Sequence, residues 1–278
     1  MDAVTVSAPA KINLSLRILR RRDDGFHDIE TFIAPISLYD ELEIVRQLSG
    51  IEFRCDDPSI PSGDDNLVVR AATAFFAETK TDGGVSIGLR KNIPHGAGLG
   101  GGSSDAASAL LALNQLFDTN LPREALAKLA EPIGSDVPFF VFESAALCRG
   151  RGELISPQRL TASVPLLLLK PEFGVSTPFA YSHWQSSTEI PDMKYGPQEY
   201  CGQVFINDLE RPVFEKFLFL ARLKTWLLGQ PEVATALMSG SGSTIFAVLK
   251  KREDAEALAE RAKNELDSKL WACGCNTI

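Results

Sequence analysis

The sequence has no surplus of positive charge, no long apolar run and no cysteine spacing typical of a zinc site. Its 278 residues include 28 Lys and Arg against 36 Asp and Glu, which gives a formal net charge of −8. This acidic balance argues against general binding to nucleic acids or anionic membranes, because both require a basic face. An anionic ligand would have to be held by local donors, such as backbone N–H groups and a few lysines.

The apolar and cysteine patterns add two expectations about location. The longest apolar run is far too short to cross a bilayer, and the N-terminal sequence MDAVTVSAPAKINL has no secretory signal. The five cysteines are scattered and include no CxxC pair, so we expect reduced thiols in a cytoplasmic protein. Cys273 and Cys275 are expected to lie in an exposed C-terminal tail.

The chain length favours two domains or lobes over one compact core. An apolar run at 164–169 predicts a buried strand that opens the second domain. We therefore expect an N-terminal domain at 1–159 and a C-terminal domain at 160–278. The polar segment 183–203 is expected to form a loop.

A glycine-rich run from Pro94 to Asp105 is the most informative segment of the sequence. A predicted strand at 85–89 precedes it, and a helix with apolar residues at helical spacing is predicted from about Ser103. Glycines leave room for the backbone to approach a ligand, and the helix N-terminus adds partial positive charge. The residues expected to bind phosphate are Pro94, Gly96, Ala97, Gly98, Leu99, Gly100, Gly101, Gly102, Ser103 and Ser104.

Other nucleotide-binding patterns fit this run less well. Gly96, Gly98 and Gly101 satisfy GxGxxG, but the second strand of a dinucleotide-binding fold does not follow at the required distance. The segment that follows, PREALAKLA, is predicted to be helical. No Lys-Ser or Lys-Thr pair follows the glycines, so the Walker A pattern fails as well.

Two short segments elsewhere carry charged residues that could act in catalysis. PAKINLSL is predicted to be a strand with Lys11 and Asn13 on its polar face, where a lysine is most often solvated. In GSDVPFF, Asp136 stands directly before an apolar run. A carboxylate in that position is either a helix cap or a paired functional charge.

Taken in order, these segments resemble the GHMP kinase superfamily. The matching stretches are PAKINLSL, DGFHDIET, IPHGAGLGGGSSDAA, GSDVPFF, FINDLE, FGVSTPFAY and MSGSGSTIFAV. The glycine motif alone is typical of the whole superfamily. DGFH combined with the triple glycine is typical of those members that phosphorylate a cytidine-diphosphate-linked polyol.

The resemblance implies an α+β fold with two lobes, an N-terminal ATP-binding lobe and a C-terminal ferredoxin-like α/β sandwich lobe. The glycine run would wrap the phosphates of ATP, with Mg²⁺ as the second cofactor. Asp136 would match the catalytic aspartate, and Lys11 would match the lysine that keeps it ionised. Phosphoryl transfer needs mainly in-line positioning and charge stabilisation, so Asp136 could either accept the proton or orient the hydroxyl.

The same resemblance implies a set of substrate contacts. His27 would read the edge of the cytosine, while Phe26 and Tyr181 would stack on its faces. Asn13 and Thr177 are weaker candidates for contacts to the hydroxyls and the diphosphate, beside Asp136. Relatives often carry tyrosine in place of Phe26 and asparagine in place of Asp105. Stacking survives the first change, whereas the role of Asp105 stays open.

The sequence thus predicts an ATP-dependent kinase for a small molecule, active as a monomer or homodimer without nucleic-acid or membrane partners. The nearest alternative is another kinase of the superfamily, such as a homoserine or mevalonate kinase. From other classes, a dinucleotide-dependent oxidoreductase and a non-catalytic nucleotide sensor remain as alternatives.

Overall fold

A computed structural model describes residues 2–278 and divides them into two compact units. The first unit contains residues 2–10, 38–94 and 100–144. The second contains Lys11–Ser37, His95–Leu99 and Ala145–Ile278. Two lobes that mix helices and strands were predicted, and this prediction is confirmed. The domain boundary at 159/160 stays a prediction.

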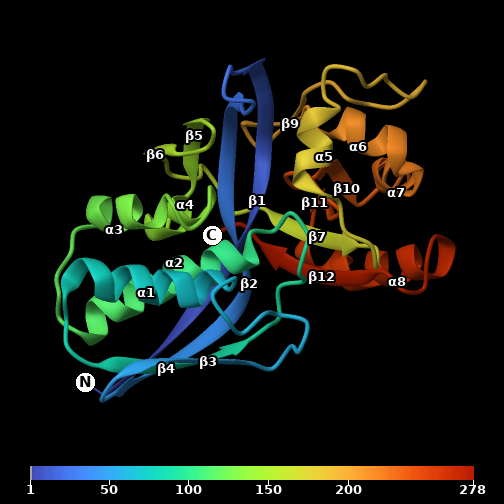
Figure 1. The fold of residues 1–278 in the computed structure, drawn as a ribbon. Helices are drawn as coiled ribbons and strands as arrows, with labels where there is room; N and C mark the ends of the chain where they lie inside the picture. Colours follow the sequence, from blue (N-terminus) through green and yellow to red (C-terminus); the bar gives the residue numbers. More distant parts are fainter. Residues whose placement is uncertain (1) are drawn as a thin grey trace. The chain divides into compact units, whose positions relative to one another are not determined.

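The first unit combines part of an eight-stranded sheet with four helices, and Figure 1 shows helices α1 and α2 running side by side. Its strands are the start of β1 (Ala3–Arg21), the end of β2 (His27–Gln47), β3 (Gly50–Cys55) and β4 (Gly84–Arg90). Its helices are α1 (Leu67–Thr79), α2 (Gly101–Leu116), α3 (Arg123–Ala130) and α4 (Val137–Val141). Strand β4 pairs antiparallel with residues 41–47 of β2 and parallel with β3.

Local sequence explains how the helices of the first unit begin. Asn66 caps α1, because its Oδ1 accepts hydrogen bonds from the backbone N–H groups of Val68 and Val69. Helix α2 begins after Gly100 instead, without a side-chain cap. Most of its residues are buried, and many are alanine or serine, so the helix can pack closely on its neighbours. The helix predicted from Ser103 is confirmed and begins two residues earlier.

The second unit contains a four-stranded antiparallel sheet in the order β10-β11-β7-β12. Helix α7 packs on β10 and β11, and α8 packs on β7 and β12. The strands of this unit are the end of β1, the start of β2, β5 (Ala146–Gly150), β6 (Leu154–Pro157), β7 (Pro165–Lys170), β8 (Gln198–Tyr200), β9 (Gln203–Asn207), β10 (Val233–Met238), β11 (Ile245–Leu249) and β12 (Trp271–Asn276). The helices are α5 (Thr177–Ser182), α6 (Glu210–Lys216), α7 (Leu218–Leu228), α8 (Ala255–Glu265) and the short 3₁₀ turn Arg252–Asp254.

Several strand predictions are confirmed, but the prediction for the C-terminus is wrong. The apolar run predicted at 164–169 forms β7, whose residues are almost all buried. The expected exposed tail is instead strand β12, which pairs along its length with β7 and buries Cys275. The alternation there is interrupted by Gly274, which hides the strand pattern from sequence inspection. No helix in residues 2–278 is long and apolar enough to span a bilayer.

Candidate functional site

The glycine run forms a loop between β4 and α2 in which every second residue has a positive φ. Gly96, Gly98 and Gly100 have φ values of 63°, 76° and 70°. Non-glycine residues seldom adopt this conformation, so the alternating glycines determine the path of the loop. The loop ends at α2, whose first N–H groups have no side-chain cap. These donors, with the partial positive charge of the helix, suit an anion such as a phosphate.

In the second unit, a Gly/Ser turn at Ser239–Ser243 supports residues 95–99 of the glycine loop. Ser239 Oγ donates to the carbonyl oxygen of Gly98 at 2.9 Å, and the N–H of Thr244 donates to that of Ala97 at 3.2 Å. The N–H of Lys11 donates to the carbonyl oxygen of Leu99 at 2.9 Å. A Cβ atom on Gly98 would lie 2.2 Å from the carbonyl oxygen of Ser239. The two glycine-rich segments are therefore in backbone contact.

This contact predicts different costs for alanine at two glycines of the loop. Gly98→Ala should lower the free energy of unfolding by about 3 kcal/mol or more, because it adds a backbone clash to the positive-φ strain. Gly96→Ala should lower it by only about 1 kcal/mol, since Gly96 has a similar φ but open space where the methyl group would lie. Urea unfolding of both variants measures the difference, and equal losses would contradict the packing described.

Lys11 and Asn13 lie together in β1 and are buried, with only 4% and 3% of their surfaces exposed. Lys11 Nζ donates to Asn13 Oδ1 at 2.7 Å, and Asn13 Nδ2 donates to Thr31 Oγ1 at 2.8 Å. Thr31 Oγ1 in turn donates to the carbonyl oxygen of Ser15. A solvated lysine was the ordinary interpretation of this strand, and the burial of Lys11 contradicts it. A buried ammonium needs oriented partners, so this chain of hydrogen bonds fixes its position.

The Gly/Ser turn also lies against Lys11. A Cβ atom on Gly240 would be 3.2 Å from Asn13 Oδ1 and 3.4 Å from Lys11 Nζ. Asn207 holds the turn, because its Nδ2 donates to the carbonyl oxygens of Met238 and Gly240, at 2.7 Å each. The structure thus brings Lys11, Asn13 and Gly98 together around one turn within the second unit.

Asp136 lies in the first unit, at the residue directly before α4. Its carboxylate makes no capping hydrogen bond to the first turn of that helix. Capping was one of the two interpretations of this residue, and the geometry removes it. Val137 and Pro138 begin the apolar helix, whose residues are all buried and hold the preceding backbone in place. The remaining interpretation is a functional charge.

His27 is packed in an aromatic cluster in the second unit. Its ring centroid lies 5.5 Å from that of Tyr181 and 6.0 Å from that of Trp184, which it meets edge to face. Burial, and to a smaller extent the charge of Arg21, lowers the pKa of His27 below its ordinary value. The ring is therefore neutral at pH 7, with one nitrogen as donor and the other as acceptor.

The other predicted substrate residues are more exposed. Phe26 is 53% exposed, and the guanidinium of Arg151 lies 4.9 Å from its ring centroid. Thr177 begins α5, and its Oγ1 lies 2.8 Å from Ser241 Oγ of the Gly/Ser turn. Both side chains can therefore contact a ligand without rearrangement of the core.

The remaining phosphate-loop residues, from Gly100 to Ser104, lie in the first unit. Ser104 Oγ is buried there, without a hydrogen-bond partner in the part of the chain that the structure describes. Asp105 is also buried and forms an ion pair with Lys91 at 2.8 Å. The structure thus supplies a partner for Asp105 that the sequence did not indicate.

Sequence reasoning missed several residues that shape these groups. Thr31, Trp184 and Ser239 contact predicted residues that are distant from them along the chain. Asn207 holds the Gly/Ser turn that lies against Lys11 and Asn13. The signal that was available for Asn207 is its place in FINDLE, one of the stretches behind the resemblance. Trp184 follows Tyr181 by three residues, a spacing that places both on one side of a helical turn.

Family models and individual proteins both resemble this chain. Residues 66–144 match the model for the GHMP kinases N terminal domain, and residues 199–268 match the model for the GHMP kinases C terminal domain. A 4-diphosphocytidyl-2-C-methyl-D-erythritol kinase of Methylacidiphilum infernorum is 43% identical, covering 88% of this chain and 86% of its own. The enzyme of the same name from Geobacter metallireducens is 38% identical, with 96% of each chain covered.

Solved structures give the same picture at the level of the fold. A crystal structure of 4-(cytidine 5'-diphospho)-2C-methyl-D-erythritol kinase matches with a TM-score of 0.82 and 35% identity, covering 99% of this chain and 100% of that one. A homoserine kinase from Cytophaga hutchinsonii has a TM-score of 0.74 but only 17% identity, covering 100% of this chain and 95% of its own. The second likeness extends to the fold alone.

Proposed function

Because the chain belongs to the GHMP kinases, and within them to the 4-diphosphocytidyl-2-C-methyl-D-erythritol kinases, we propose that it carries out the reaction of that family. It transfers the γ-phosphate of ATP to the 2-hydroxyl of 4-diphosphocytidyl-2-C-methyl-D-erythritol. The reaction belongs to the non-mevalonate route to isoprenoid precursors. The observation that carries the proposal is the similarity to these kinases along nearly the whole chain.

The aromatic cluster around His27 favours this substrate over homoserine or mevalonate, which carry no base. A neutral imidazole can donate one hydrogen bond and accept another, which matches the polar edge of cytosine. Tyr181, in contact with His27, and the exposed ring of Phe26 can stack on the faces of the base. The likeness to the homoserine kinase, at 17% identity, gives no support for that activity.

We assign the chemical roles as follows. Asp136 orients the 2-hydroxyl and accepts its proton, and Lys11 supplies a positive charge for the transfer. The glycine loop and the uncapped N-terminus of α2 bind the phosphates of ATP, which positions the γ-phosphate for in-line attack. Asn13 and Thr177 contact the substrate's hydroxyls and diphosphate.

Mg²⁺ enters in this proposal as part of the Mg·ATP substrate. Residues 2–278 contain no group of three or more His, Cys, Asp and Glu side chains arranged to hold a metal ion. Mg²⁺ retains several waters and is often bound through substrate phosphates with few protein ligands, so a dedicated cage is not required. In this proposal both substrates, the phosphate acceptor and the nucleotide, are small molecules.

ADP release from a panel of phosphate acceptors tests the proposed function. With Mg·ATP and the purified protein, we expect turnover of 4-diphosphocytidyl-2-C-methyl-D-erythritol and little or none of homoserine or mevalonate. Turnover of homoserine without turnover of the cytidylyl substrate would reverse the assignment. Tight binding of NADH without binding of ATP would instead favour an oxidoreductase.

Replacing His27 by alanine should selectively weaken binding of the cytidylyl substrate. The loss of hydrogen bonds to the base, worth about 1–3 kcal/mol, predicts a KM for that substrate raised by about 5- to 150-fold. The KM for ATP should stay within about twofold of wild type, since the loss is confined to the base. Steady-state kinetics with each substrate varied in turn measures both values.

His183→Ala provides the matched control for that experiment. His183 is exposed, and its Nδ1 is bonded to the backbone oxygen of Phe179 within α5. It should leave both KM values near wild type. An equal rise in the two KM values for His27→Ala would mean that His27 acts on the fold and not on the base.

A further inference from the structure

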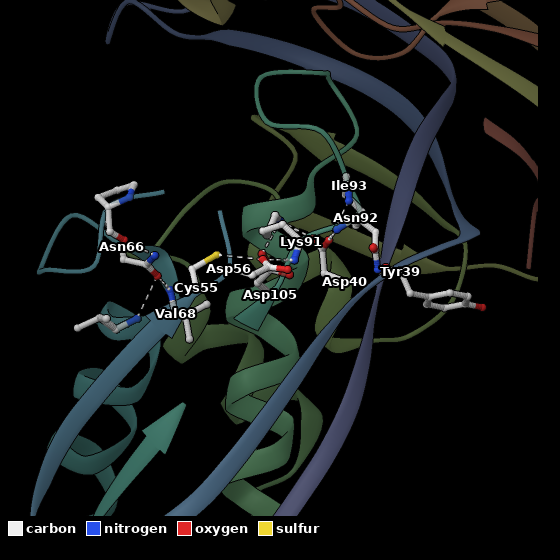
Figure 2. A network of polar contacts seen from close by, with 12 residues as sticks. Tyr39, Asp40, Cys55, Asp56, Asn66, Val68, Lys91, Asn92, Ile93 and Asp105 are labelled. Atoms are coloured by element: carbon white, nitrogen blue, oxygen red, sulfur yellow. Dashed lines mark hydrogen bonds and ion pairs between the residues drawn. The ribbon is translucent and has the colours of Figure 1, made fainter. Parts of the chain in front are cut away.

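A buried charge cluster in the first unit joins three separate parts of the chain. Lys91 Nζ donates to Asp40 Oδ2, and it also donates to Asp105 Oδ2 at 2.8 Å. Asp40 belongs to β2, Lys91 follows β4, and Asp105 lies in α2. All three side chains are nearly inaccessible, with at most 8% of each exposed. Figure 2 shows Lys91 between the two carboxylates.

The cluster connects the two ends of the glycine loop. On one side, Asp40 Oδ1 accepts hydrogen bonds from the backbone N–H groups of Asn92 and Ile93, at 2.6 and 2.8 Å. These residues lead directly into Pro94. On the other side, Asp105 lies in the first turns of α2, where the loop ends. Lys91 therefore links the start of the loop to its end by one ammonium group.

Close packing at the same place holds the two ends of the glycine loop against each other. A Cβ atom on Gly101 would lie 3.0 Å from Ile93 Cγ2 and 3.2 Å from Lys91 Nζ. Glycine at this position lets the backbone of α2 approach the ammonium group directly. The first residues of α2 and the residues before Pro94 are thus held in fixed register.

We propose that Asp40, Lys91 and Asp105 are positioning residues that clamp the two ends of the glycine loop in the shape that receives the phosphates of ATP. The inference rests on the proposed function in naming ATP as the ligand. It assigns none of the three residues a direct contact with the nucleotide. Removing the ammonium would break the hydrogen bonds to both Asp40 and Asp105, so the two ends of the loop would lose their shared partner.

The protonation of Asp105 supports this arrangement. Burial raises the pKa of Asp105 to about 8, against the opposing effect of the Lys91 charge. The carboxyl group is therefore largely neutral at pH 7. Its Oδ1 atom has no hydrogen-bond partner in the described residues. Above pH 8 the group ionises and places a negative charge beneath the loop.

The charges around Asp105 come from a few elements. Lys91 and Asp40 are the charged groups that act on it directly, and the pKa of Lys91 is raised, so its ammonium stays charged through pH 9. Asp56 accepts the backbone N–H of Lys91 at 2.9 Å, and Cys55 precedes it. The helices packed on α2 carry further charges, which are not among the main causes of the raised pKa of Asp105: Arg70 and Glu78 on α1, and Arg123, Glu124 and Lys128 on α3.

Amide hydrogen exchange and ATP binding on the full chain test the clamp together. In Lys91→Met we expect amide exchange to rise at least tenfold at Asn92, Ile93 and Ser104, whose hydrogen-bonded N–H groups flank the loop. The Kd for ATP, measured by calorimetry without acceptor, should rise by about 10- to 100-fold. Lys170→Met removes another buried lysine, whose Nζ donates to the backbone oxygen of Pro171. It should change neither quantity.

The variant Asp105→Asn separates the effect of the charge of the Asp105 side chain from the effect of its shape. Asparagine matches the protonated carboxyl in shape and still accepts from Lys91, so exchange and the Kd at pH 7 should stay near wild type. Bound phosphate is expected to raise the pKa of Asp105 further. The wild-type Kd for ATP should therefore rise between pH 7.5 and 9, by about tenfold for each unit of that increase in pKa. The asparagine variant should lack this part of the rise.

The outcomes separate this inference from the proposed function. Unchanged exchange of the amides that flank the loop in Lys91→Met, or an equal alkaline rise of Kd in Asp105→Asn and wild type, would overturn the clamp. Should Lys91→Met fail to fold, Asp105→Leu cuts the same link from the helix side, with the same expected exchange. Failure of the wild-type protein to bind ATP would refute the proposed function, while the exchange measurement would still decide whether the clamp exists.

Discussion

Asp136→Asn is expected to lower kcat by about 10²- to 10⁴-fold, the range usually lost with a positioned proton acceptor. The KM for ATP should stay near wild type, because the nucleotide is held by backbone groups of the glycine loop. The carboxamide keeps the shape of the side chain, and α4 does not depend on the carboxylate for a cap, so the fold should persist. Single-turnover measurement of ADP formation would report the chemical step directly.

A control for this variant is Asp65→Asn, which neutralises an exposed carboxylate before α1. Its kcat should equal that of wild type, and its thermal unfolding should match that of Asp136→Asn within a few degrees. Near-normal phosphoryl transfer by Asp136→Asn would refute the assigned role. A protein that binds ATP but never turns over, with or without Asp136, would be a nucleotide sensor.

Lys11→Met should lower kcat by about 10²- to 10³-fold, as removal of a preorganised charged donor does in other active sites. Methionine fills a similar volume, and the backbone hydrogen bond from Lys11 to Leu99 is retained. The loss should therefore be catalytic more than structural. If Lys11 and Asp136 act together in catalysis, the effects of the two substitutions are not additive, and the double variant should be no slower than Asp136→Asn alone. A double-mutant cycle of wild type, the two single variants and the double variant measures this.

Lys170→Met is the matched control for this change as well. Lys170 is also buried, and burial lowers its pKa, yet it lies in β7 and has no proposed part in catalysis. Its variant should keep the wild-type kcat. Equal losses of activity in the two lysine variants would show that burial of a lysine, and not the place of Lys11, accounts for the effect.

Local sequence patterns predicted much of the fold. Amphipathic spacing located α2, and a continuous apolar run located β7, because both signals depend only on neighbouring residues. Strand β2 runs without a break from His27 to Gln47. Nothing local marks whether a strand continues through a change of partners, since its first part pairs with β5 and its last part with β4.

The candidate site was predicted in part for the same reason. The glycine loop could be recognised because its function depends on a contiguous run of small residues with positive φ. Lys11 gave a weaker signal, since alternation along β1 shows which face a lysine occupies and not whether that face is covered. Trp184 was missed because an aromatic residue in a polar segment has no pattern to distinguish it from a surface residue.

By itself, the sequence determined the glycine loop, the superfamily and the residue types proposed for catalysis, since each is encoded in a short contiguous segment. The tertiary structure alone decided which distant residues support them. In the folded chain Lys11 is a buried hydrogen-bond donor and not a surface lysine. Asp105 is paired with Lys91, and its pKa is raised. Burial and charge pairing depend on residues far apart in the chain, so only the folded arrangement specifies them.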